Sequence, residues 1–209
     1  MTELDPPTIL CQRCDTTTRF PYSVREYVVK GLWFVVQSTL FRLPLPRLSG
    51  WRRMLLRCFG ASIDPTAVVS STVTVWHPWL LKVGEYSALS DRVCVYNLGW
   101  IVIGSHTVVS QDVYLCGGTH DYTKTNLPLV RKSIVVGHGV WLCAGVFIGP
   151  GVTVGDNAIV GARAVVMSDV PPRVVTFGNP ARVIRDRPMP DSDEGLTGTG
   201  SQAGGNESH

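Results

Sequence analysis

The chain has 209 residues, 44% of them hydrophobic and 17% charged, and a formal net charge of +3 at pH 7. These values are typical of one globular domain with extensions, and they exclude a strongly charged chain. Lys and Arg are scattered apart from a cluster between Arg42 and Arg57, so nucleic acid is not an expected partner.

The first residues, MTELDPPTIL, lack the positively charged start and apolar run of a secretory signal peptide. We therefore expect a reducing, cytoplasmic location for the six cysteines. Cys11 and Cys14 form a CxxC pair, but a four-ligand zinc site needs a second pair, and the next cysteine is Cys58. An incidental pair is favoured over a metal site.

Residues 1–60 show no repeat and are expected to form an N-terminal extension with aromatic and basic helices. The apolar stretch from Tyr27 to Leu43 is interrupted by polar residues and is shorter than the roughly 18 apolar residues that a membrane-spanning helix needs. Two interpretations stay open. A helix packed on the domain or on a neighbouring subunit is favoured, but the aromatic and basic residues up to Arg57 also suit helices lying on an anionic membrane surface.

Between residues 63 and 166, aliphatic residues recur every six residues, with the spacing widened to eight after Val75 and Val95 and a longer gap after Leu115. The next residue is usually glycine or serine, and the fourth residue after each aliphatic is usually small or β-branched. This period fits short strands joined by tight corners, with one large and one small side chain pointing inward on each side. The fifteen aliphatic positions are Ile63, Val69, Val75, Val83, Leu89, Val95, Ile103, Val109, Leu115, Val136, Leu142, Ile148, Val154, Val160 and Val166.

Three such sides make one coil of a triangular prism, and the repeat is long enough for about five coils. The predicted fold is therefore all-β, with a parallel β-helix domain at residues 61–187. Glycines are expected at the corners, because a positive φ is needed there. The tail at residues 188–209 is rich in Ser, Gly and acidic residues and is predicted to be disordered.

The repeat breaks at GGTHDY. More residues separate Leu115 from Val136 than the next side needs, so the chain is expected to leave the prism after Thr119 and form a loop at about residues 117–134. His120 lies where the chain leaves. A loop on a rigid scaffold suits a catalytic side chain, and histidine exchanges a proton near neutral pH. The alternative is a histidine that merely occupies a surface corner.

Residues 63–187 resemble the left-handed parallel β-helix, or hexapeptide-repeat, acyltransferases. The stretch VWLCAGVFIGPGVTVGDNAIVGARAVVMSDVPPRVVTFGNPARVIRDR is similar to the carboxyl half of maltose, galactoside and nodulation-factor O-acetyltransferases. The WRRMLLRCFGA segment, the YNLG turn and the LCGGTHDY loop most resemble the colanic-acid acetyltransferases of exopolysaccharide clusters. The resemblance implies a homotrimer, acetyl-CoA in a groove along the coils, no metal, and a sugar or lipid-linked oligosaccharide as acceptor.

The resemblance also implies roles for particular residues. His120 matches the general base that takes the proton of a sugar hydroxyl, and the backbone N–H of Ala144 matches the oxyanion donor. Trp141 matches a tryptophan that lines the acceptor and pantetheine groove, although a corner aromatic between subunits explains it equally well. The remaining matches are Asn97 for the acceptor and Gly161, Ala162, Arg182 and Arg185 for the cofactor.

The chain departs from the family at Met167 and Ser168, where relatives carry Thr-Lys and thus a cation near CoA. Arg163 or Arg173 is a candidate substitute. Asp121 is a candidate to orient the His120 imidazole, although adjacent side chains often point apart. The other histidines of the repeat are interpreted as surface or corner residues, namely His77, His106 and His138.

Three other functions are considered. A γ-class carbonic anhydrase has the same prism but needs closely spaced zinc-binding histidines, which this chain lacks. A serine O-acetyltransferase normally has a large helical amino-terminal domain, which is not evident. A non-catalytic scaffold stays open, because the change at Met167 and Ser168 favours it while the His120 loop opposes it.

Overall fold

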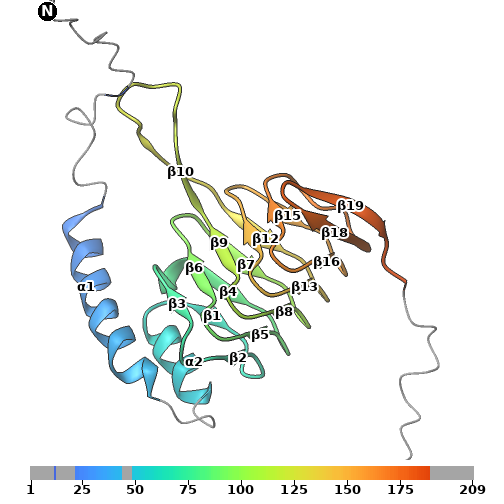
Figure 1. Ribbon diagram of the computed structural model, residues 1–209. Coiled ribbons are helices and arrows are strands. Elements are labelled where there is room, and N and C mark those ends of the chain that lie inside the picture. Colours follow the sequence, from blue (N-terminus) through green and yellow to red (C-terminus); the bar gives the residue numbers. More distant parts are fainter. Residues whose placement is uncertain (1–11, 13–21, 44–48, 189–209) are drawn as a thin grey trace, which may run out of the picture.

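The computed structural model describes Gln12, residues 22–43 and residues 49–188. The predictions for Cys11, Cys14 and residues 189–209 concern residues outside this set. Two helices lie at one end of a solenoid of short strands, and a hairpin projects from its side (Figure 1).

The helical segments come first along the chain, and the strands follow. The helices are α1 (Val24–Ser38), η2 (Leu40–Arg42), α2 (Ser49–Cys58) and the short η4 (Pro78–Leu80). The strands are β1 (Ser62–Ile63), β2 (Val68–Val69), β3 (Thr74–Val75), β4 (Leu81–Val83), β5 (Ala88–Leu89), β6 (Cys94–Tyr96), β7 (Ile101–Ile103), β8 (Val108–Val109), β9 (Tyr114–Cys116), β10 (Gly118–His120), β11 (Leu129–Arg131), β12 (Ile134–Val136), β13 (Trp141–Leu142), β14 (Phe147–Ile148), β15 (Thr153–Val154), β16 (Ile159–Val160), β17 (Val165–Val166), β18 (Val174–Gly178) and β19 (Ala181–Asp186).

The strands stack as three parallel sheets, one on each side of the prism. Sheet A has the order β1-β4-β7-β12-β15, sheet B contains β2-β5-β8-β13-β16-β18, and sheet C has the order β3-β6-β9-β14-β17. β19 pairs antiparallel with β18 at the end of sheet B. The prediction of a parallel β-helix is confirmed, with about six turns instead of five, because β18 begins a further coil.

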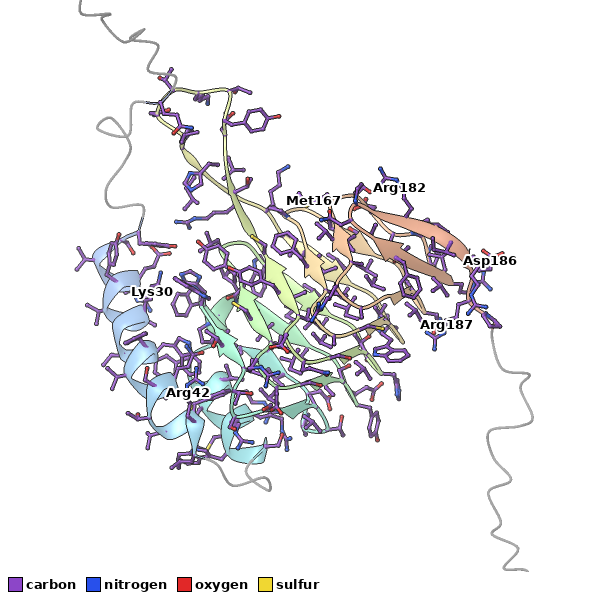
Figure 2. The ribbon with its side chains drawn as sticks, in the orientation of Figure 1. Lys30, Arg42, Met167, Arg182, Asp186 and Arg187 are labelled. Carbon is purple, nitrogen blue, oxygen red and sulfur yellow. The ribbon has the colours of Figure 1, made fainter. Side chains whose placement is uncertain are left out.

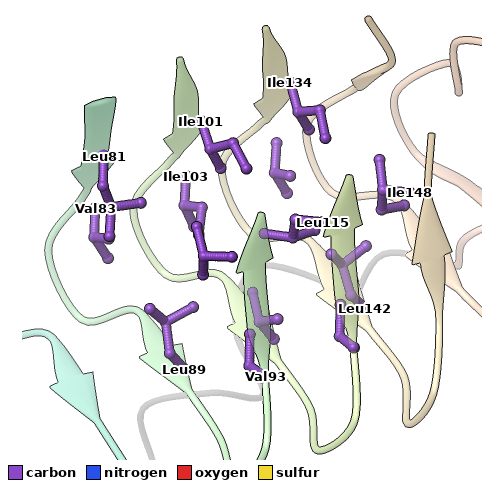
Figure 3. Packing of buried hydrophobic residues seen from close by; sticks show 14 of the residues in the cluster. Leu81, Val83, Leu89, Val93, Ile101, Ile103, Leu115, Ile134, Leu142 and Ile148 are labelled. Carbon is purple, nitrogen blue, oxygen red and sulfur yellow. The ribbon is translucent and has the colours of Figure 1, made fainter. Parts of the chain in front are cut away.

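The inward side chains form a continuous aliphatic column through the prism (Figure 3). All fifteen residues of the six-residue pattern are buried, none with more than 5% of its surface exposed. Parallel register places Val83 beside Ile103, and Ile103 beside Val136, in successive coils. Each buried Val, Leu or Ile contributes about 1.5–3 kcal/mol, so stacking the coils is the main source of stability.

The glycines after the inward aliphatic residues do not have the predicted role. A Cβ on Gly84 would lie 2.7 Å from the Gly104 carbonyl carbon, and one on Gly104 would lie 2.6 Å from that of Gly137. Glycine is needed there because successive coils approach closely. A positive φ at the corners is instead adopted largely by other residues, which are Tyr86, Arg92, His106, Asp112, Asn157, Arg163 and Arg173.

α2 covers the open end of the solenoid, where the first coil has no preceding coil to pair with. Its arginines donate hydrogen bonds to backbone carbonyls of that coil, and Arg52 also binds the carbonyl oxygens of Phe41 and Leu43. The backbone carbonyl groups at the open edge of the first coil thereby receive hydrogen bonds. These arginines therefore hold the helix on the solenoid while they keep their positive charge. The bonds to the first coil join Arg52 to Val69, Arg53 to Ala67, and Arg57 to Ile63.

α1 packs one face against the edge of sheet C. Ser23 and Glu26 form a capping box at its start. The Trp33 indole N–H donates to the Val75 carbonyl at 2.6 Å, and the Gln37 side-chain oxygen accepts from the Val75 N–H at 2.7 Å. The helix packs on the domain as predicted, but the expectation that its apolar face makes this contact is wrong, because Val24, Val28, Leu32 and Val35 stay exposed.

His77 is buried, so its interpretation as a surface or corner residue is wrong, whereas His106 and His138 are exposed at corners as predicted. The His77 Nδ1–H donates to the Asn97 carbonyl at 3.0 Å, and the ring packs against Trp79. Burial, together with the positive charge of Lys30, lowers the pKa of His77 to about 4.

His77 is predicted to make the folded protein less stable as the pH falls. Unfolded histidine binds a proton below its ordinary pKa of about 6.5, whereas folded His77 stays neutral until about pH 4. The free energy of unfolding should therefore fall between pH 6.5 and pH 4, and His77→Gln should flatten this fall. Urea denaturation at pH 7 and at pH 5 measures this change in the free energy of unfolding. His138→Gln is the control and should keep the wild-type slope; an unchanged slope in His77→Gln would contradict the assignment.

Candidate active site

The predicted loop is a β-hairpin in which β10 and β11 pair antiparallel (Figure 1). His120 pairs with Leu129 at the outer end of the hairpin and is exposed to solvent. The chain leaves the prism at Gly118, two residues earlier than the predicted departure after Thr119. Thr119 is therefore exposed on the hairpin and not packed inside the coil.

The His120 ring is held by the backbone of its own hairpin. Its Nδ1 lies 2.7 Å from the Leu127 carbonyl oxygen. Because a carbonyl oxygen only accepts, Nδ1 carries the proton and Nε2 presents a free lone pair. This is the form of histidine that acts as a base. Sequence reasoning missed Leu127, since no motif marks a backbone carbonyl seven residues away.

Asp121 does not orient His120, so that hypothesis is wrong. Its carboxylate accepts hydrogen bonds from the N–H and hydroxyl of Thr123 and forms an ion pair with Lys124 at 3.6 Å. The bonds from Thr123 lower the pKa of Asp121 below its ordinary value. Asp121 thus stabilises the turn of the hairpin.

Asn97 is also not an acceptor-facing residue. It is completely buried, its Oδ1 accepts from the His77 N–H at 2.9 Å, and its Nδ2 donates to the His77 carbonyl. Its turn lies under the base of the hairpin, where the Gly117 N–H donates to the Tyr96 carbonyl at 2.8 Å. A Cβ on Gly118 would collide with Leu98. The YNLG turn therefore supports the hairpin from below.

Trp141, Ala144 and Ala162 lie together on another edge of the prism. Trp141 points outward from sheet B with 47% of its surface exposed, and its indole N–H donates to the Ser110 hydroxyl at 3.0 Å. Ala144 and Ala162 occupy the same corner in successive coils, after β13 and β16. Within the described residues, the Ala144 N–H has no hydrogen-bond acceptor. That N–H remains available to an outside oxygen.

Gly161 does not leave space for a ligand. A Cβ at this position would lie 2.0 Å from the Phe177 ring, so the space beside Gly161 is already filled by the chain itself. Phe177 lies on β18, at the equivalent position of the next coil. The packing of Phe177 explains why glycine is needed at this position, and the predicted course of the Gly161 backbone along pantetheine stays a prediction.

Arg182 and Arg185 are both exposed on β19. Arg182 borders a hollow of about 140 Å³ that Ser168 and Asp169 also line, and Figure 2 shows Met167 and Arg182 at the same end of the molecule. Arg163, one of the candidate substitutes for the missing cation, donates its backbone N–H to the Ala144 carbonyl. The other candidate, Arg173, lies at a different corner beside Arg187.

The predicted site residues therefore fall into two groups within one chain. His120 stands on a hairpin that leaves the corner between sheets C and A, whereas Trp141, Ala144 and Ala162 lie on sheet B and its corner with sheet C. A complete site needs both groups at one acyl carbon. In the described part of the chain, no three His, Cys, Asp or Glu residues are grouped as a metal site would require.

Known proteins are similar to this chain in sequence and in fold. Residues 133–168 match the family model for bacterial transferase hexapeptide (six repeats). WcaF of Escherichia coli K12, named for acetyl transfer in colanic acid biosynthesis, is 45% identical over 156 residues, covering 75% of this chain and 86% of its own. The chain belongs to the hexapeptide-repeat acetyltransferase family and is an acetyltransferase.

Solved structures show the same architecture. A maltose O-acetyltransferase from Clostridium difficile 630 is 25% identical, with a TM-score of 0.72, over 80% of this chain and 90% of that chain. A galactoside acetyltransferase solved in complex with coenzyme A is 24% identical, with a TM-score of 0.73, over 80% of this chain and 84% of that chain.

Gly161→Ala is predicted to destabilise the fold by about 1–3 kcal/mol, because the new methyl group collides with the Phe177 ring. Urea denaturation measures the free energy of unfolding. The matched control is the same substitution in a Phe177→Ala background, where the collision is removed and the further loss should be small. A full loss in both backgrounds would contradict the packing role.

Proposed function

We propose that this acetyltransferase moves the acetyl group of acetyl-CoA to a sugar hydroxyl in exopolysaccharide biosynthesis. The observation that carries the proposal is the His120 imidazole, held by Leu127 with Nε2 exposed. Two comparisons support it: the name of the Escherichia coli relative and the coenzyme A bound to the galactoside acetyltransferase.

In the proposed reaction, His120 Nε2 takes the proton of the acceptor hydroxyl as its oxygen attacks the thioester carbonyl carbon. The Ala144 N–H donates a hydrogen bond to the negative charge that develops on the carbonyl oxygen. When the C–S bond breaks, the imidazolium returns the proton to the departing CoA thiolate. Acetyl ester and CoA are formed, and His120 is regenerated as a neutral base.

The division of the site between two edges of one chain supports the proposed homotrimer. Sheet B carries an outward column of apolar side chains in register, which includes exposed Val68, Val108 and Trp141. Such a column on a monomer is a suitable surface for a second copy. In this proposal, the hairpin of one subunit brings His120 to the Trp141 and Ala144 edge of its neighbour.

The acyl donor is proposed to lie along that edge. Ala162 has a small exposed side chain there, and Arg182 and Arg185, with Arg163, supply the positive charge that CoA phosphates require. Cys58, Cys94, Cys116 and Cys143 are free thiols, in keeping with a cytoplasmic protein. The proposed acceptor is a sugar or a lipid-linked oligosaccharide.

His120→Ala is predicted to lower kcat by about 10²- to 10⁴-fold, because the attacking hydroxyl loses its base. CoA release from acetyl-CoA, measured by thiol titration with a panel of sugars and lipid-linked oligosaccharides, tests this. His138→Ala is the control, since His138 is also exposed at the edge of the solenoid. Full turnover in His120→Ala would remove His120 from the mechanism, and acetyl-CoA binding without transfer to any acceptor would favour a scaffold.

Arg182→Ala combined with Arg185→Ala is predicted to raise the KM for acetyl-CoA by about 10- to 100-fold, from the loss of charge-assisted hydrogen bonds to phosphate. The rise should be much smaller for acetyl-dephospho-CoA if one of these arginines binds the 3′-phosphate. Arg92→Ala is the control, because Arg92 pairs with Asp112 on the solenoid surface. An unchanged KM for acetyl-CoA in the double variant would mean that the CoA phosphates do not bind at these two arginines.

A further inference from the structure

α1 lies along the outside of the solenoid (Figure 1), and its outward face carries exposed apolar side chains from its first turn to its last. Val24, Val28, Leu32 and Val35 recur at helical spacing, and each has more than half of its surface exposed. Phe34 is exposed to 68% beside them. Leu40 and Leu43 continue the apolar surface beyond the end of the helix. No described residue covers it.

The polarity of α1 is the reverse of that of an ordinary surface helix. Its inward face includes Gln37, which is buried, and Lys30, whose Nζ lies 5.0 Å from the Trp76 ring centroid. The outward face has no charged residue between Arg25 and Arg42. Water is therefore a poor partner for this outward face, and an apolar medium is a good one.

The formal charge of the N-terminal helical segment decides between two possible partners for the outward face of α1: a second copy of the chain and a lipid surface. Residues 22–60 contain seven Lys or Arg and one acidic residue, a formal charge of +6, whereas the whole chain has 19 and 16, a formal charge of +3. The α2 arginines donate hydrogen bonds to backbone carbonyls, and because a carbonyl group has no net charge, the positive charge of these arginines is not neutralised. A second copy would bring the same positive charge to the contact, but an anionic lipid surface brings the opposite charge.

The length of α1 limits the way in which it meets a bilayer. Fifteen residues make a helix of about 22 Å, shorter than the roughly 30 Å of a hydrocarbon core. Within the described residues, no helix is long and apolar enough to cross a membrane. A helix of this length can lie along a bilayer surface but cannot span the hydrocarbon core.

A cavity of about 550 Å³ adjoins the same face, lined in part by Leu32, Phe59 and Trp79. It reaches from α1 toward the end of α2, and its lining also includes the polar or charged residues Ser23, Arg25 and Glu26. At the start of α1, the Arg131 guanidinium carbon lies 4.7 Å from the Tyr22 ring centroid. The base of the His120 hairpin is thereby joined to the helix.

We propose that the outward face of α1 binds the surface of an anionic phospholipid bilayer. Val24, Val28, Leu32, Phe34 and Val35 enter the boundary between headgroups and acyl chains, and Arg25 and Arg42 meet lipid phosphates. The Tyr22–Arg131 contact then holds the hairpin with His120 close to the membrane. The binding depends on α1 and the η2 segment that follows it, and it is independent of the proposed acetyl transfer.

Flotation of the full chain with vesicles tests this proposal. The vesicles contain phosphatidylcholine alone or with 30 to 40 mol % (about one lipid in three) phosphatidylglycerol. The test variant is Val28→Glu with Val35→Glu, and the control is Tyr86→Glu with Ile184→Glu. The four positions are exposed to 57%, 60%, 61% and 62%, so the two variants change the same charge at equally exposed sites.

The wild type and the control should float with anionic vesicles, and the test variant should lose about tenfold or more of the bound fraction. Binding should also weaken with salt and with phosphatidylcholine alone, because part of it is electrostatic. Equal binding by test variant and control, or no binding by the wild type, would overturn the proposal. A change in sedimentation of the test variant without vesicles would assign the face to a second copy instead.

Discussion

The structure depends on the close, in-register approach of each coil to the next. Parallel pairing places every inward aliphatic residue beside its equivalent, as Ile103 lies beside Val136, so that no coil buries its core alone. The same approach leaves no space for a side chain at Gly84 or Gly104. Because rigidity comes from this repeated contact, side chains at corners and in insertions are free to serve chemistry.

A stack of coils has two open ends, and the chain closes them differently. The arginines of α2 satisfy carbonyls of the first coil, as Arg57 does for Ile63. At the other end, β19 folds back on β18. This closure also affects α1. Its Trp33 and Gln37 side chains point inward and form hydrogen bonds with the Val75 backbone, and its outward face is left apolar.

The candidate site shows how an insertion acquires a function on such a scaffold. The hairpin rests on the YNLG turn, which the Asn97 side chain ties to the buried His77 backbone. Its Leu127 carbonyl then selects the tautomer of the neutral His120 ring, with the proton on Nδ1. Trp141 and Ala144, which the proposal assigns to the acyl-donor groove, lie on another edge of the prism and are therefore separated from the proposed base within a single chain.

The sequence by itself determined the repeat, the aliphatic core, the presence of an insertion at His120 and the helical character of the N-terminal segment. These features are local or periodic, and burial follows directly from the period. Only the tertiary structure decided the partners of single polar groups: His77 and Asn97 bind one another, Asp121 stabilises a turn, and Gly161 faces Phe177. Such contacts join residues from successive coils or from the two strands of a hairpin, and the spacing of residue types does not encode where those atoms meet.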